Sequence, residues 1–294
     1  MVNRRQIVDP PAFTPLPYGL LSVAQHPTAS DSHWQNGVTY QSRCLNAGDT
    51  TYSIDCGMAV TGTGPAPAPP ALTDNVDLMT RGATSFVAYA EFDCAPVGMA
   101  NALQIAEDAL AQSADYDVER AFWTGKAANQ TVVFPHLAAT ADITDGDTLL
   151  QSTASVVVTG SPSPAIALGL LEQAIADCSN GQGVIHVQRK VLPVLFKAQV
   201  LDVRGGQIVT KSGNLVAAGA GYPGTGPAGQ AITSTTSWMF ATGPVFAYSS
   251  PTKINDLRSA LDRTTNTVKY IAERTYVIGW DCCHAAVQTD TSAA

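Results

Sequence analysis

The sequence predicts an α+β fold that is organised around one long helix. Three observations predict it: an amphipathic stretch at residues 96–125, a helix followed at once by a strand at 161–187, and the chain's longest strand pattern at 267–280. In the first stretch apolar residues recur at steps of three and four, the period of one helix face: Met99, Leu103, Ala106, Leu110, Ala114, Val118 and Phe122. Glu107, Asp108, Asp115, Asp117, Glu119 and Arg120 fall mostly off that stripe.

Asp93 and Pro96 suit the start of this helix and Gly125 its end. About 28 residues would then span about 42 Å, long enough for a rigid spine on which other layers pack. An ordinary amphipathic core helix broken near Ser113 is the alternative.

The region before the helix predicts extended structure. Residues 1–37 hold five prolines and little periodicity, which indicates an extended arm with short helical or strand pieces lying on another surface. Residues 38–57 predict two strands around a turn, 62–70 a Pro/Ala-rich tip, and 86–92 a returning strand. A long two-stranded ribbon over 38–92 follows, and such a ribbon needs a partner surface to become ordered.

The region after the helix alternates strands and helices. Residues 155–159 predict a short buried strand, and Ser161 to Pro164 open a second helix that ends at Asn180-Gly181 and leads into a strand at 183–187. The face of this second helix comprises Ile166, Leu170, Leu171, Ala174 and Ile175.

The last third predicts mostly strands. Short strands are expected within 191–203, at 207–210 and at 215–218, followed by a glycine loop at 219–229. Trp238–Phe240 and Val245–Tyr248 indicate one strand region broken at Gly243-Pro244. In the strand at 267–280, Val268, Tyr270 and Ala272 lie on one face, and Lys269, Ile271 and Glu273 on the other.

Composition limits the classes of function. The 294 residues suit one elaborate domain or two intimate subdomains, yet only 14% are charged, against about 25% in ordinary soluble domains. Either neighbouring subunits cover much of the surface, or the protein is of a neutral, Thr/Ser/Gly-rich secreted type. The start of the chain has no signal-like apolar run, and no segment approaches a spanning helix. A net charge of −8 argues against sequence-specific nucleic-acid binding.

No motif predicts chemistry. Gly219, Gly221 and Gly224 spell GxGxxG, but Pro223 and Pro227 interrupt the helix that a dinucleotide site requires. No phosphate-binding loop or GxSxG nucleophile motif is present, and His26, His33, His136, His186 and His284 lack a local acid–base signature. We therefore name no catalytic, cofactor-binding or metal-ligating residue and expect no cofactor.

The six cysteines show no zinc-like pair, and neighbours on a strand point to opposite faces, so Cys282, Cys283 and His284 cannot easily share an ion. The default expectation is reduced, mostly buried thiols. The remaining cysteines are Cys44, Cys56, Cys94 and Cys178.

The order of elements resembles that of the major capsid proteins of tailed phages, the Hong Kong 97 fold, which encapsulin shells share. The last quarter carries most of the resemblance: GPVFAYSSPT at 243–252 and TVKYIAERTYVIGWDCCHAAVQ at 267–288 are similar to the family's closing strands. The helix at 164–178 followed by GQGVIHV resembles the helix-to-strand step of the axial domain.

This resemblance implies an N-terminal arm at 1–37, an extended loop at 38–92, a peripheral domain at 93–135 and 245–280, and an axial domain at 136–244 and 281–294. It implies a non-enzymatic major capsid protein that self-assembles, as pentamers and hexamers, into an icosahedral shell around double-stranded phage DNA. The implied place is the virion capsid, assembled in the bacterial host cytoplasm without a membrane. The other implied partners are a portal, a separate scaffolding protein (the chain looks too short to carry a large scaffolding segment of its own) and a decoration protein.

One departure from the family is readable. Some members crosslink subunits through a lysine in the extended loop, but residues 38–92 contain no lysine. We therefore expect no such crosslink.

Three other interpretations stay open. An encapsulin compartment has the same fold but encloses an enzyme, and Pro10, Pro11, Pro15 and Pro17 disfavour the arm helix that its cargo groove would need. A secreted, β-rich binding module would fit the Thr/Ser/Gly content. An enzyme with a scattered active site would depend on residues such as His136 or His186.

Overall fold

The computed structural model describes residues 11, 13–42, 80–94, 102–127, 130–131, 134–139, 141–145, 148–152, 154–156, 160–179, 181–262 and 267–292. The four α-helices in this part are α1 (Leu20–Val23), α2 (Ala102–Thr124), α3 (Pro164–Ser179) and α4 (Leu192–Lys197). Short 3₁₀ turns lie at His33–Asn36, Arg189–Val191 and Pro227–Gly229. No helix among the described residues combines the length and the apolar character that crossing a membrane requires.

The strands are short except for β3, β15 and β16. They are β1 (Val38–Gln41), β2 (Thr80–Ala83), β3 (Ser85–Cys94), β4 (Lys126–Ala127), β5 (Gln130–Thr131), β6 (Ile143–Asp145), β7 (Thr148–Gln151), β8 (Ser155–Val156), β9 (Val184–His186), β10 (Leu201–Arg204), β11 (Gln207–Thr210), β12 (Leu215–Ala217), β13 (Thr236–Thr242), β14 (Val245–Ser249), β15 (Lys253–Asp262), β16 (Thr267–Trp280) and β17 (His284–Asp290).

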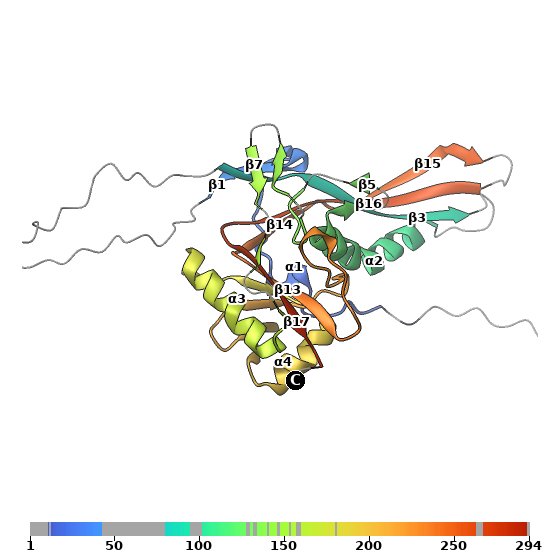
Figure 1. The fold of residues 1–294 in the computed structure, drawn as a ribbon. Coiled ribbons are helices and arrows are strands. Elements are labelled where there is room, and N and C mark those ends of the chain that lie inside the picture. The colour runs from blue at the N-terminus through green and yellow to red at the C-terminus, as the bar shows by residue number, and fades with distance from the viewer. Residues whose placement is uncertain are drawn as a thin grey trace, which may run out of the picture.

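Two sheets form the body of the molecule (Figure 1). The mixed seven-stranded sheet has the order β10-β11-β12-β9-β13-β17-β8 and lies with α3 and α4 in the lower part of the view. In the second sheet β16 is central: β3 pairs along one side of it, and β14 and β15 share the other. This second sheet extends to the upper right beside α2. The break expected at Gly243 and Pro244 is confirmed, because these residues separate β13 from β14, but the two strands lie in different sheets rather than in one strand region.

The long helix is confirmed as α2, with its C-terminus at Thr124 directly before Gly125. Gly125 adopts a φ of +67°, which suits glycine at a helix end. Residues 95–101 lie outside the described part, so Pro96 and Met99 are not tested. Ala106, Leu110, Ala114, Val118 and Phe122 are buried as expected. Leu103, however, is 41% exposed, and Glu119 is buried although it was placed off the stripe.

Several other local expectations are corrected. The run at 191–203 forms a 3₁₀ turn, α4 and β10 rather than strands alone, because a short apolar run does not distinguish a buried helix from a buried strand. In α3, Ile166 is 60% exposed, and Ala167, Leu168, Leu171 and Ile175 form the buried face instead. Strand β8, expected to be buried, lies at a sheet edge with both described residues exposed.

The N-terminal segments lie against the same chain. Leu20 is fully buried in the core, and Gln25 exchanges backbone hydrogen bonds with β14 through the Val245 carbonyl and the Ala247 N–H, each 2.8 Å long. Strand β1 pairs antiparallel with β2, from Val38 opposite Ala83 to Gln41 opposite Thr80. This pair is the base of the expected ribbon; residues 43–79, with its strands and tip, lie outside the described part. The expected returning strand is confirmed as β3, although its partner is β16.

Candidate functional site: buried histidines, a polar groove and exposed apolar residues

His186, one of the two histidines named for a scattered active site, is enclosed in the core, and His136 is half-buried. His186 on β9 has no exposed surface, and its ring contacts Phe122 and Tyr222. The Thr242 hydroxyl donates to the Gly243 carbonyl at 3.0 Å, so it accepts from His186 Nε2 at 2.9 Å, and Nδ1 accepts from the Tyr222 hydroxyl at 3.1 Å. Both ring nitrogens are therefore engaged, and a substrate would have to open the core to reach them.

Burial also keeps these rings neutral. It lowers the pKa of His186 to about 3, with a further contribution from His284, and it lowers the pKa of His284 to about 4. The pKa of His136 is lowered by burial as well, and its Nδ1 lies 2.8 Å from the Phe134 carbonyl. A neutral imidazole whose pKa is far below 7 is a poor general base at physiological pH.

The side chains of Cys282, Cys283 and His284 do not converge on one metal site. Cys283 forms a disulfide with Cys178 in the last turn of α3, and the two Cα atoms are 5.8 Å apart. For these two residues the disulfide corrects the expectation of reduced thiols, since their sequence separation of 105 residues hid the pairing; Cys44 and Cys56 lie outside the described residues. His284 turns instead toward the Ser152 carbonyl, 3.1 Å from its Nδ1. Within the described residues no group of three potential ligands is placed to hold a metal ion.

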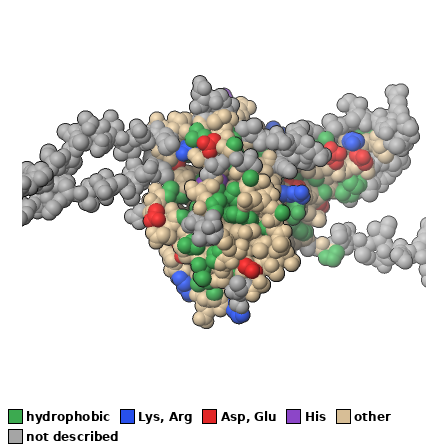
Figure 2. Space-filling view, viewed as in Figure 1, with side chains coloured by type: hydrophobic (Ala, Val, Ile, Leu, Met, Phe, Trp, Pro, Cys, Tyr) green, Lys and Arg blue, Asp and Glu red, His purple; other side chains and the backbone are tan. Residues whose placement is uncertain are grey.

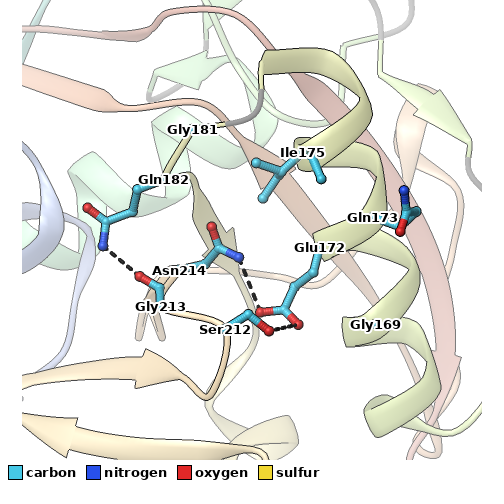
Figure 3. Close-up of a pocket in the computed structure, with 10 residues that line it drawn as sticks. Gly169, Glu172, Gln173, Ile175, Gly181, Gln182, Ser212, Gly213 and Asn214 are labelled. Atoms are coloured by element: carbon cyan, nitrogen blue, oxygen red, sulfur yellow. Dashed lines mark hydrogen bonds between the residues drawn. The ribbon is translucent and has the colours of Figure 1, made fainter. Parts of the chain in front are cut away.

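A polar groove of about 550 Å³ lies between α3 and the turn that joins β11 to β12 (Figure 3). The Glu172 side chain points from α3 into this turn and accepts hydrogen bonds from the Thr210 hydroxyl, from Ser212 Oγ at 2.9 Å and from Asn214 Nδ2 at 3.2 Å. On the opposite wall Gln182 donates to the Gly213 carbonyl at 2.6 Å. Because this carboxylate accepts hydrogen bonds from donors of the same chain, it anchors the β11–β12 turn to α3. The residues that line the groove include no histidine or cysteine.

The glycine loop at 219–229 packs on α2 and holds no ligand cradle. A Cβ at Gly221 would overlap the Tyr116 carbonyl of α2, and one at Gly224, whose φ is +73°, would overlap the Gln188 side chain. The glycines of GxGxxG are thus needed for close backbone packing, and a 3₁₀ turn rather than a phosphate-binding helix follows them.

Exposed apolar side chains occur on elements at the margins of the molecule. The seven-stranded sheet ends in β10 and β8, where Val203 is 52% and Val156 is 48% exposed. Val87 and Tyr89 alternate along β3 on the face away from α2, and they are 45% and 47% exposed. Charged side chains are few in the view of Figure 2, and several of both signs lie close together at its upper right. Apolar residues at sheet margins and a weakly charged surface are suited to contact with other protein chains.

No protein-family model matches the sequence, and no curated protein matches it. Among solved structures the chain is similar to the capsid of an empty GTA particle, with 11% identity and a TM-score of 0.56 over 98% of this chain and 95% of that one. This chain has the Hong Kong 97-type capsid fold. It is likewise similar to the capsid of Ralstonia phage GP4, with 10% identity and a TM-score of 0.56 over 98% and 95% of the two chains. For a structure of Gordonia phage Cozz these values are 12% and 0.52, over 98% and 91%.

The sequence reasoning missed the features that depend on distant contacts. Three such features each join segments that lie at least 38 residues apart: the hydrogen bonds of Glu119, the Cys178–Cys283 disulfide and the hydrogen bonds of Glu172. One local signal could have indicated that Glu119 is buried: it directly follows Val118, which belongs to the apolar stripe of the helix.

Proposed function

We propose that this chain is a major capsid protein: many copies self-assemble into an icosahedral shell that encloses the double-stranded DNA genome of a tailed phage. The observation that carries this proposal is the capsid fold. The structural similarity to capsid subunits covers 98% of this chain.

The domain boundaries expected from the sequence belong to this proposal. The arm would comprise residues 1–37 and the extended loop 38–92, of which the base is β1 and β2. The peripheral domain would combine 93–135 with 245–280, which is supported by the packing of α2 on β16. The axial domain would combine 136–244 with 281–294, which is supported by the pairing of β17 with β13 in the seven-stranded sheet.

The surface supports assembly rather than catalysis. The exposed apolar residues of β3, β8 and β10 would be covered by neighbouring copies in pentamers and hexamers, as would much of a surface with 14% charged residues. The fully buried His186 and the hydrogen-bonded Glu172 carboxylate are poorly placed for acid–base catalysis, and we propose a non-enzymatic role.

The charge suits a DNA container. A net charge of −8 disfavours tight adhesion of packaged DNA to the wall, so the genome can leave the shell. We place the protein in the virion capsid after assembly in the host cytoplasm. A portal, a separate scaffolding protein and an external decoration protein would complete the particle.

The test is the mass and shape of the purified protein, by light scattering and negative-stain electron microscopy, alone and with a co-expressed scaffolding protein. Closed shells tens of nanometres across would support the proposal, and enclosed DNA would distinguish a phage capsid from an encapsulin that holds an enzyme. A monomer or small oligomer under both conditions would refute it. Boiled, reduced particles should run as single subunits on denaturing gels, since residues 38–92 contain no lysine for a crosslink.

A further inference from the structure

Three segments that lie far apart in the sequence meet at the side chain of Glu119. This residue is on α2 and is only 3% exposed. Its Oε1 accepts the backbone N–H of Leu20, the first residue of α1, at 3.0 Å, and its Oε2 accepts that of Gly221, in the glycine loop, at 2.9 Å. The two donors are 99 and 102 positions away along the chain. α1 lies beside α2 in the fold (Figure 1).

Only a carboxylate fits this arrangement. It is an acceptor at both oxygens, so it serves two N–H groups at once, whereas an amide of the same shape would present its NH₂ to one of them. Burial raises the pKa of Glu119, and the hydrogen bonds from Gly221 and Leu20 oppose that rise. Because burying an ionisable group is costly, an apolar side chain would serve better if filling space were its task.

Both segments approach α2 closely, the loop at the helix backbone and the arm at the Glu119 side chain. A Cβ at Gly19 would overlap the Glu119 carboxylate, and a Cβ at Gly221 would overlap the Tyr116 carbonyl. The two segments also touch each other, because the N–H of Ala218 donates to the Tyr18 carbonyl at 2.7 Å. Arm segment, helix and glycine loop therefore form a closed set of contacts, in which moving one member disturbs the other two.

We propose that Glu119 is a latch: it couples the docking of arm residues 17–23 to the docking of loop residues 219–224 on α2, so that the two segments are released together. The latch is a property of the single subunit. Its use in the shell, where it would let subunits in different symmetry positions change arm and loop jointly, rests on the proposed function.

Hydrogen exchange of the full-length, unassembled subunit, read by mass spectrometry, tests the coupling. Glu119→Gln keeps the shape and loses one acceptor, so amides in 17–23 and 219–224 should both exchange faster, by about tenfold. Residues 239–242 of the core strand β13 serve as the reference and should not change; Trp238 is left out because its N–H donates to the Gly224 carbonyl of the loop at 2.9 Å. Asp117→Asn, at an exposed position on the same helix, is the matched control and should leave all three segments unchanged.

The proposal is overturned if only one of the two segments responds, if neither responds, or if β13 loosens equally, since a general loss of stability would affect every segment. A second pair of variants covers the case in which Glu119→Gln does not fold. Leu20→Pro removes the N–H that Glu119 accepts, and Leu20→Ala keeps that N–H while removing the side chain. Proline fits there, because Leu20 opens α1 and Gly19 is extended, with φ −74° and ψ −179°.

If the latch exists, residues 219–224 exchange faster in Leu20→Pro than in Leu20→Ala. Equal exchange of this loop in the two variants refutes the coupling. Because every measurement uses the unassembled subunit, a failure of the latch leaves the capsid proposal standing, and a failure to form shells leaves the latch standing.

Discussion

The seven-stranded sheet is covered on both faces by its own chain, whereas the sheet of β3, β14, β15 and β16 is covered by α2 on one face. Along β13, Met239 and Ala241 pack in the cluster that includes α3, and Trp238 and Phe240 pack in the cluster that includes α2. Along β3, Phe86 and Ala88 are buried toward α2, but Val87 and Tyr89 remain nearly half exposed. The middle of the first sheet is covered within one chain, although Val203 and Val156 at its edges are exposed, whereas the second sheet leaves apolar side chains exposed on one face.

We expect the largest effect on the stability of the free subunit from a substitution that leaves a cavity beside the seven-stranded sheet. Phe240 is fully buried, and its ring packs edge-on against Trp123, with 5.0 Å between ring centroids. We expect Phe240→Ala to lower the free energy of unfolding by about 3–5 kcal/mol, because it leaves a cavity between the two layers. Urea unfolding at neutral pH measures this loss.

Phe196→Ala is the matched control, since Phe196 on α4 is 39% exposed. It should cost less than about 1 kcal/mol. Equal losses in the two variants would contradict the view that the core of this sheet is complete within the chain.

The disulfide should give the next largest effect. It joins α3 to the start of β17 across a sequence separation of 105 residues, and Cys283 is 5% exposed. Removing the crosslink with Cys178→Ser should lower the free energy of unfolding by about 2–4 kcal/mol, because the unfolded chain loses a long closed loop. Unfolding with and without a reductant measures it: the reductant should destabilise the wild type and leave Cys178→Ser unchanged.

Cys282→Ser is the control, because Cys282 is outside the disulfide. It should retain the sensitivity of the wild type to reductant. If the wild type and Cys178→Ser unfold alike in the oxidised state, the crosslink does not contribute to this region.

Acid should weaken the same region. Burial lowers the folded-state pKa of His186 to about 3 and that of His284 to about 4, so the unfolded chain binds more protons below pH 6.5. The free energy of unfolding should then fall as the pH is lowered from about 6.5 toward 4, by up to roughly 1.4 kcal/mol per pH unit for each ring. Glu119 has the opposite sign, since burial raises its pKa and favours the folded state at low pH.

His186→Gln separates these contributions, because it removes one imidazole and leaves Glu119 in place. Its unfolding free energy should depend less steeply on pH between 6.5 and 4 than that of the wild type. Identical pH profiles for His186→Gln and the wild type would show that His186 is not buried as a neutral ring.

The sequence predicted the elements whose signals are local and long. Helix α2 and strand β16 carry a repeated pattern over many residues, so their existence followed from periodicity, as did β9 directly after α3. The rest depended on tertiary contacts. Ile166 has the character of a buried residue, yet it is exposed, because α3 turns Ala167, Leu171 and Ile175 toward the sheet. No local pattern could reveal that Cys178 and Cys283 would be adjacent, or that Glu119 would serve the N–H groups of two distant segments.

The smallest effect on the free subunit, and the sharpest test of the comparison, concerns the face of β3 away from α2. Tyr89 is 47% exposed there, so Tyr89→Ser should change the free energy of unfolding by less than about 0.5 kcal/mol. If neighbouring copies cover this face in the shell, the same substitution should raise the concentration needed for assembly by about tenfold, or roughly 1.4 kcal/mol per subunit. Tyr89→Phe keeps the apolar ring and should assemble as the wild type does.

Light scattering against subunit concentration gives the assembly threshold, and urea unfolding gives the stability of the free subunit. Undiminished assembly of Tyr89→Ser would mean that this face stays open to solvent in the particle, and a large loss of subunit stability would mean that the second sheet is as complete as the first.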